Sequence, residues 1–313
     1  MRIAIPPMGP YTEIIRSIGS SLHWDDLTPP KLTQPDIDLG ARYMDELMCL
    51  PAKATLGTLV RACEQGADTL LIFNSCGQCR LKAYWILQQR ALRKMGYQAR
   101  VQPITLGRHT VHDLRMVDPS ISYWKGWLVF YRILRQLWKF DQGFWKQFHI
   151  DGGPKIGIVG EIYTILEDAI NCNLMKKLNK LGASVHNSLP LSYFIFKGFH
   201  DRGWLKRPGM DMSILKKAHS IAHHYFPIDD FGGHGKESVI HTIYYGLMSF
   251  DGVIHVLPFP CAPESTVAPI LSDISNDFSI PLLKLIFDTQ TGEAGLVTRL
   301  EAFVDMLKRK RNV

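Results

Sequence analysis

Short apolar runs alternate along the chain with longer segments whose apolar residues recur at helical spacing. The runs lie at residues 2–7, 69–73, 97–104, 155–160, 183–187, 252–259 and 281–287. Apolar runs of this length, separated by helices, are typical of buried strands in a mostly parallel sheet with helices on both faces. The pattern therefore predicts an α/β protein.

The predicted strands fall into two groups, which indicates two lobes. The chain has 313 residues, which is long for a single hydrophobic core. We expect a Rossmann-like N-terminal lobe at 1–107 and a Rossmann-like C-terminal lobe at 151–313. An aromatic helical connector at 108–150 would join them. A helical insertion at about 200–230 would interrupt the second lobe.

The connector predicts one amphipathic helix. Its cations Arg132, Arg135 and Lys139 are assigned to one side, which makes it too charged to cross a membrane. The amphipathic pattern favours packing on the protein itself, with docking to a partner or to a membrane surface as the alternative. The apolar side is expected to comprise Trp127, Phe130, Tyr131, Leu134, Leu137 and Trp138.

Composition and charge narrow the class of protein. The first residues, MRIAIPPMGP, lack the apolar core of a signal peptide, so we expect a cytoplasmic protein with reduced thiols and no transmembrane segment. Six cysteines are too few for a disulfide scaffold. The net charge is +7, but no nucleic-acid-binding motif accompanies it, so no nucleic-acid partner is expected.

Four cysteines lie at the ends of predicted strands or helices. Cys76 and Cys79 follow the run at 69–73, Cys261 follows the run at 252–259, and Cys49 precedes a predicted helix. Ligands of open α/β sheets bind beyond the carboxyl ends of the strands, so these three loops can converge. A helix N-terminus also favours a thiolate. Four thiolates suit a 4Fe–4S cluster or a zinc ion.

The CGQC segment leaves a second kind of chemistry open. A structural zinc site usually pairs two such segments, and this chain has one, which favours iron and sulfur over zinc. A strand followed by CGQC also resembles a dithiol redox motif, in which Cys76 would attack and Cys79 would resolve. That chemistry leaves Cys49 and Cys261 without a role.

The other two cysteines are weaker candidates. Cys63 lies on the apolar stripe of its predicted helix, which indicates a buried structural thiol. Cys172 lies off the stripe of its helix and is a minor ligand candidate. With both included, six cysteines could support a larger, double-cubane cluster.

Four polar residues near predicted strand ends are candidates for a proton donor or a substrate contact. Two lie directly after strands and two lie in loops, and they are Glu161, His234, Glu264 and Asp288. Helix capping and loop hydrogen bonding are the alternative roles for such residues. The sequence favours these structural roles over catalysis.

Several long segments, in order through both lobes, match one family. The chain resembles the acyl-CoA dehydratase activase-related proteins, also called CoA protein activases. These are relatives of the 2-hydroxyacyl-CoA dehydratase D-component and of double-cubane cluster proteins. The matching segments are PPMG, ELMCLPAKATLG, SCGQCRLKAY, GIVGEIYTILEDAINCNLMKKLNKLGASVH, GGHGKESVIHT, DGVIHVLPFPCAPES and FDTQTGEAGLVTRLEAFVD.

The resemblance implies a two-lobed fold with a 4Fe–4S cluster whose cysteine motifs map onto Cys49, Cys76, Cys79 and Cys261. It implies low-potential electron transfer from an ATP-dependent activator protein, in anaerobic metabolism. Some relatives reduce or dehydrate CoA thioesters. The resemblance therefore also allows that this chain is an enzyme that acts on an acyl-CoA or on another small molecule. A homodimer is a further option.

The chain departs from the family pattern in two loops. Gln78 stands where the family usually has a proline, and Thr289 and Gln290 stand where it has an acid and a histidine. If the acid or the histidine transfers protons in the family, this loop lacks the side chain that does so.

Overall fold

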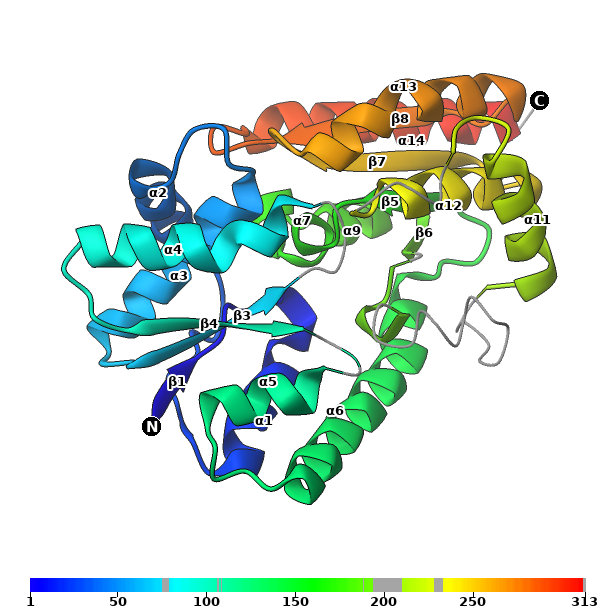
Figure 1. The fold of residues 1–313 in the computed structure, drawn as a ribbon. Coiled ribbons are helices and arrows are strands. Elements are labelled where there is room, and N and C mark those ends of the chain that lie inside the picture. Colours follow the sequence, from blue (N-terminus) through cyan, green and yellow to red (C-terminus); the bar gives the residue numbers. More distant parts are fainter. Residues whose placement is uncertain are drawn as a thin grey trace. The chain divides into compact units, whose positions relative to one another are not determined.

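The computed structural model describes residues 1–74, 79–105, 107, 109–187, 189–193, 210–227 and 233–311. The chain divides into two compact units, Met1–Phe140 and Asp141–Val313. Each unit contains one four-stranded sheet in which all pairings are parallel, with helices packed on it (Figure 1). The predicted α/β class with two Rossmann-like lobes is confirmed.

Unit 1 builds its sheet from four strands in the spatial order β2-β1-β3-β4. Six registered pairs join β3 to β4, from Thr69 opposite Arg100 to Asn74 opposite Thr105. The strands are β1 (Arg2–Ala4), β2 (Asp25–Asp26), β3 (Thr69–Asn74) and β4 (Arg100–Thr105).

The helices of unit 1 cover both faces of this sheet (Figure 1). Buried residues of α3 and α4 form one core with β1, β3 and β4, which includes Leu56, Leu59, Leu70 and Leu92. The helical segments are η1 (Gly9–Tyr11), α1 (Thr12–Leu22), α2 (Gln34–Tyr43), α3 (Leu50–Glu64), η2 (Arg80–Ala83), α4 (Tyr84–Lys94), α5 (Thr110–Val117) and α6 (Tyr123–Phe144), whose residues from Asp141 on belong to unit 2.

Two glycines allow α2 and α3 to pack against each other at very short range. A Cβ atom at Gly40 would lie 1.7 Å from the carbonyl oxygen of Lys53, and one at Gly57 would lie 1.8 Å from that of Asp36. No larger side chain fits at either position, because backbone atoms occupy the space. This packing fixes α3, whose N-cap residue is Cys49.

The long helix α6 buries only part of the side that its hydrophobicity predicts. Of that side, Leu137 is buried and Phe130, Leu134 and Trp138 are half-buried. The buried side chains of α6 are Val129, Ile133 and Leu137, whereas Trp127 and Tyr131 are exposed. The expectation that Trp127 and Tyr131 lie on the buried side is wrong. Gly126 explains the choice of face, because a Cβ there would lie 2.7 Å from Cγ1 of Val111, so α6 approaches α5 closely at this point.

Unit 2 repeats the strand order of unit 1. Its spatial order is β6-β5-β7-β8, so in both units the second, first, third and fourth strands along the chain lie side by side. The strands are β5 (Lys155–Gly160), β6 (Ser184–Asn187), β7 (Gly252–Pro258) and β8 (Leu282–Phe287). All seven apolar runs in the sequence therefore form strands, and only β2 was missed among the described strands.

Helices also enclose the sheet of unit 2. Gly157 of β5 packs against the ring of Tyr245 in α12, and Gly252 of β7 packs against Phe303 and Leu307 in α14. The helical segments are η3 (Trp145–Phe148), α7 (Ile162–Leu166), α8 (Asp168–Asn171), α9 (Leu174–Lys180), α11 (Met212–Ala222), α12 (Gly235–Leu247), α13 (Ala262–Asp277) and α14 (Glu293–Arg311).

The expected insertion at about 200–230 is described only in its second half, where α11 packs on α12. Residues 194–209 and 228–232 lie outside the described part of the chain. Among the described helices, none has the length and apolar character needed to pass through a lipid bilayer.

Candidate metal centre

The third strand of each unit leads into a loop that carries a cysteine. Cys79 follows β3, and Cys261 follows β7. Each of these strands lies next to the first strand of its own sheet, where the strand order reverses. Open α/β sheets bind ligands beyond the carboxyl ends of the strands at such a reversal. Cys79 and Cys261 therefore occupy equivalent positions in two sheets of the same topology.

Cys49 reaches its position from the helix that precedes β3. It is the N-cap residue of α3, and its side chain is buried. The hydroxyl oxygen of Tyr84, the first residue of α4, lies 2.6 Å from Sγ of Cys49. The sulfur is therefore in contact with a polar group that can donate a hydrogen bond to it.

Cys79 is the N-cap residue of η2, and its sulfur accepts a hydrogen bond. The donor is the backbone N–H of Leu81, at 3.5 Å. Amide hydrogen bonds of this kind to cysteine sulfur help to set the reduction potential of iron–sulfur clusters. The local backbone of this loop thus already points a donor at the thiol.

Side-chain hydrogen bonds tie the Cys49 and Cys79 segments together within unit 1. The guanidinium of Arg80, next to Cys79, donates to the carbonyl oxygen of Leu47, close to Cys49. Further along, Nε2 of Gln88 in α4 donates to the carbonyl oxygen of Ala52 at 3.2 Å and to Thr55 Oγ1 at 2.7 Å. These bonds and the Tyr84 contact hold the starts of α3 and α4 to each other.

Cys76, which the sequence pairs with Cys79 in the CGQC segment, falls within residues 75–78, outside the described residues. Its predicted role as a ligand stays a prediction. Cys49 and Cys79 belong to unit 1, and Cys261 belongs to unit 2.

Cys261 is buried and forms the N-cap of α13. The first turn of that helix carries Glu264, whose side chain is also buried. Its Oε2 accepts a hydrogen bond from Ser238 Oγ at 2.9 Å and lies 2.8 Å from Nε2 of His255. Glu264 thus links α13 to α12 and to the central strand β7, and it faces the interior of unit 2.

Two atoms of this buried cluster have no hydrogen-bond partner among the described residues. They are Oε1 of Glu264 and Nδ1 of His255. Sequence reasoning singled out Glu264 but missed His255, because a histidine within a fully buried strand gives no sign of what it faces. The contacts of Glu264 with Ser238 and His255 hold α13 to α12 and β7 in the interior of unit 2.

Glu161 and Asp288 hold local structure. The carboxylate of Glu161 caps α7 by accepting hydrogen bonds from the N–H groups of Tyr163 at 2.9 Å and Thr164 at 2.8 Å. Oδ1 of Asp288 accepts from the N–H of Gln290 at 2.9 Å, within its own loop. These are the capping and loop roles that the sequence allows for both residues.

His234 stands in unit 2 where Cys49 stands in unit 1. It is the N-cap residue of α12, the helix that leads into the third strand β7, as α3 leads into β3. Its Nδ1 accepts a hydrogen bond from the N–H of Ile162 at 3.3 Å. The sequence hides this correspondence, because the two units share a strand order without a visible repeat of residues.

The pKa values of the two weaker cysteine candidates are raised. Burial, with a smaller contribution from Glu64, raises the pKa of Cys63 to about 11. Burial also raises the pKa of Cys172, and nearby Glu293 acts in the same direction. Because metals bind the thiolate, a raised pKa disfavours both residues as ligands.

The candidate ligands are cysteine sulfurs, which suit a metal or cluster that binds thiolates, but the described residues alone do not form a full set of ligands. Among them, no three His, Cys, Asp or Glu side chains converge closely enough to hold a metal ion. The sulfur atoms of Cys49, Cys79 and Cys261 all stand at helix N-caps. Sulfur donors alone suit iron–sulfur clusters or zinc.

Comparisons with known proteins add no family assignment. The sequence matches no protein-family model, and no curated protein matches it. The resemblance to the acyl-CoA dehydratase activase-related proteins therefore rests on the segments quoted above.

Proposed function

We propose that the protein is an iron–sulfur protein that transfers electrons at low potential. Its ligands are Cys49, Cys76, Cys79 and Cys261, and its cluster is of the 4Fe–4S type. The observation that carries the proposal is the paired arrangement of Cys49 and Cys79. Two sulfurs from different loops stand at helix starts that Tyr84 and Arg80 hold together.

The surroundings of these sulfurs suit a redox centre. The cluster, when bound, supplies one-electron transfer. The chain supplies the thiolates and at least two groups that can donate hydrogen bonds to them, the Leu81 amide and the Tyr84 hydroxyl. Such donors help to set the reduction potential of the cluster. Burial of Cys49 and Cys261 limits access of water to their sulfurs.

The family resemblance supplies the partner in this proposal. An ATP-dependent activator protein donates the electron, and the chain passes it on. A reductase or dehydratase that acts on a CoA thioester at an open iron site, or at a double-cubane cluster, is the alternative within the same chemistry. A second alternative uses no iron–sulfur cluster: the protein would bind zinc, or the CGQC segment would act as a dithiol redox pair.

The test begins with anaerobic purification and analysis of iron, sulfide and zinc. We expect about four iron and four sulfide ions per chain, with an electron paramagnetic resonance signal after reduction. Cys49→Ser, Cys79→Ser and Cys261→Ser should each lower the iron content or change the signal. Cys63→Ser and Cys172→Ser are the matched controls and should leave both unchanged. Zinc without sulfide would overturn the proposal.

Two additions separate the proposed role from its enzymatic alternative. An activator protein with ATP should reduce the cluster, and the reaction should stop when ATP is withheld. A change of the resonance signal on addition of an acyl-CoA would instead indicate an open iron site. A cluster that no ATP-dependent donor reduces would contradict the electron-transfer role while leaving the cluster itself in place.

A further inference from the structure

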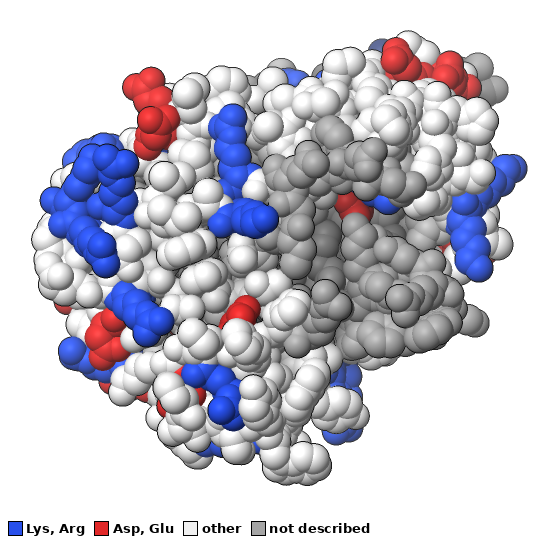
Figure 2. All heavy atoms as spheres, viewed as in Figure 1, with Lys and Arg blue, Asp and Glu red and all other residues white. Residues whose placement is uncertain are grey.

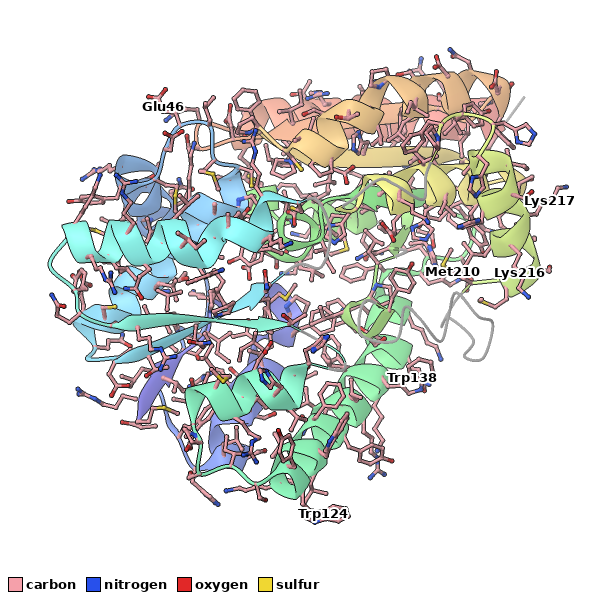
Figure 3. The ribbon with its side chains drawn as sticks, in the orientation of Figure 1. Glu46, Trp124, Trp138, Met210, Lys216 and Lys217 are labelled. Carbon is pink, nitrogen blue, oxygen red and sulfur yellow. The ribbon has the colours of Figure 1, made fainter. Side chains whose placement is uncertain are left out.

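The first half of α6 exposes an apolar strip that the fold does not use. Trp124 is 81% exposed and Tyr131 is 65% exposed, and Trp127 and Leu128 are also exposed. Trp124, Leu128 and Tyr131 are spaced by four and three residues, so they lie along one face of the helix. Figure 3 shows Trp124 at the lower end of α6, pointing away from the helix.

The opposite face anchors the helix to unit 1. Val129, Ile133 and Leu137 are buried, and Ser17 Oγ of α1 donates a hydrogen bond to Oε1 of Gln136 at 3.1 Å. The ring of Tyr11 also packs on Phe140, with 5.0 Å between ring centroids. The exposed strip therefore belongs to a helix that is fixed in the fold and needs no rearrangement to be presented.

Positive charge borders the strip. Arg132, Arg135 and Lys139 are exposed, and no ion pair engages them within the described part of the chain. Lys125 lies beside Trp124 in the sequence, and the guanidinium of Arg115 in α5 sits 3.9 Å from the ring centroid of Tyr123. The one acidic residue of α6, Asp141, is buried. In Figure 2 the lower end of this region is white, with blue cations beside it.

We propose that this face of α6 docks unit 1 onto an anionic lipid surface. Trp and Tyr prefer the level of the lipid headgroups, where an aromatic ring can be partly buried while its polar atom stays hydrated. Lys and Arg beside them are attracted to anionic headgroups. An amphipathic helix of this composition lies in the plane of the membrane surface and does not cross it.

The charge pattern argues against a second copy of the chain as the occupant. A symmetric dimer would place the same face against itself. Arg132, Arg135 and Lys139 of both copies would then lie in or beside one interface, with no carboxylate on the exposed face of either helix to offset them. Like charges across an interface are unfavourable. A partner protein would need a strongly acidic, apolar surface of its own.

The experiment measures cosedimentation of the full chain with vesicles of phosphatidylcholine alone or mixed with phosphatidylserine, at physiological salt. We expect binding to the anionic vesicles and much weaker binding to the neutral ones. Trp124→Ser with Tyr131→Ser should weaken binding at least about tenfold. Arg132→Gln with Arg135→Gln should weaken it about thirtyfold. Quenching of tryptophan fluorescence by brominated lipid should weaken in the first of these variants, in which Trp127 is the remaining exposed tryptophan of the strip.

Matched controls use the same changes elsewhere in unit 1. Arg93→Gln with Lys94→Gln removes two exposed cations from α4, and Leu47→Ser removes an exposed apolar side chain. Both should keep binding within about threefold, because distant charges are screened. Failure of the wild-type chain to bind anionic vesicles would overturn the proposal, as would equal binding by all variants. A dimer that Trp124→Ser dissociates would overturn it in favour of self-association.

Discussion

The hydroxyl oxygen of Tyr84 lies 2.6 Å from the sulfur of Cys49, and both side chains are buried. Tyr84 opens α4, and Cys49 directly precedes α3. Since Arg80 also bonds to the carbonyl oxygen of Leu47, two contacts connect the segment that carries Cys79 with the segment that carries Cys49. The position of one candidate ligand therefore depends on the position of the other.

Removal of this hydroxyl should alter both stability and redox behaviour. Tyr84→Phe keeps the ring and deletes the hydrogen bond, so we expect a loss of about 1 kcal/mol in the free energy of unfolding. In the cluster-loaded protein the reduction potential should become more negative, because one donor to sulfur is gone. Urea unfolding of the apo protein and a redox titration of the loaded protein measure the two effects.

The exposed Tyr43 provides the control for this variant. Tyr43→Phe should change the free energy of unfolding by less than about 0.5 kcal/mol and leave the potential unchanged, because Tyr43 is 52% exposed. If Tyr84→Phe left the potential unchanged while lowering stability, the hydroxyl would have a purely structural role and the sulfur of Cys49 would not be coupled to the redox centre.

The sequence predicts the strands better than the contacts between them. Each apolar run became a strand, whereas β2 consists of two aspartates and has no apolar pattern to detect. Hydrophobicity also predicted only part of the buried side of α6, because apolar residues lie all round this helix and the close approach to α5 at Gly126 does not show in the sequence pattern. The Cys49–Tyr84 contact joins residues 35 positions apart, and no local pattern encodes it.

The α2–α3 contact should tolerate no side chain at Gly57. A Cβ atom there would lie 1.8 Å from the carbonyl oxygen of Asp36, and a backbone atom cannot swing away as a side chain can. We expect Gly57→Ala to lower the free energy of unfolding by about 3 kcal/mol.

Gly143 of α6 is the matched control, because a Cβ atom there would meet open space among the described residues. Gly143→Ala should raise the free energy of unfolding by up to about 1 kcal/mol, through the better helix propensity of alanine. Urea unfolding followed by circular dichroism checks both variants. Equal stability of Gly57→Ala and wild type would contradict the close packing of α2 on α3.

Cys63 should react slowly with alkylating reagents in the folded protein. Its pKa is raised from 9.0 to about 11, chiefly by burial. At pH 8 its thiolate fraction is therefore roughly a hundredfold smaller than that of an unperturbed thiol. Mass spectrometry after iodoacetamide treatment of the apo protein measures the rate at each pH, and the same protein in urea is the control.

The raised pKa of Cys63 also makes the free energy of unfolding depend on pH. The unfolded thiol ionises at lower pH than the folded one, so the contribution of Cys63 to stability falls as pH rises from about 9 toward about 11. Cys63→Ala should lack this part of the pH dependence. A labelling rate that levels off near pH 9 in the folded protein would show that the thiol is not desolvated.

The Glu264–His255 contact should be a main determinant of stability in unit 2. Glu264→Leu leaves Nε2 of His255 and the hydroxyl of Ser238 buried without their partner, and each unsatisfied group costs about 1–3 kcal/mol. We expect a total loss of about 2–6 kcal/mol in the free energy of unfolding. Glu264→Gln keeps an acceptor for Ser238 and should lose less.

Glu301→Leu, on an exposed position of α14, should stay within about 0.5 kcal/mol of wild type. Urea unfolding of the apo protein ranks the three variants, and equal stability of Glu264→Leu and Glu301→Leu would show that the buried carboxylate is not needed to hold α13 to β7.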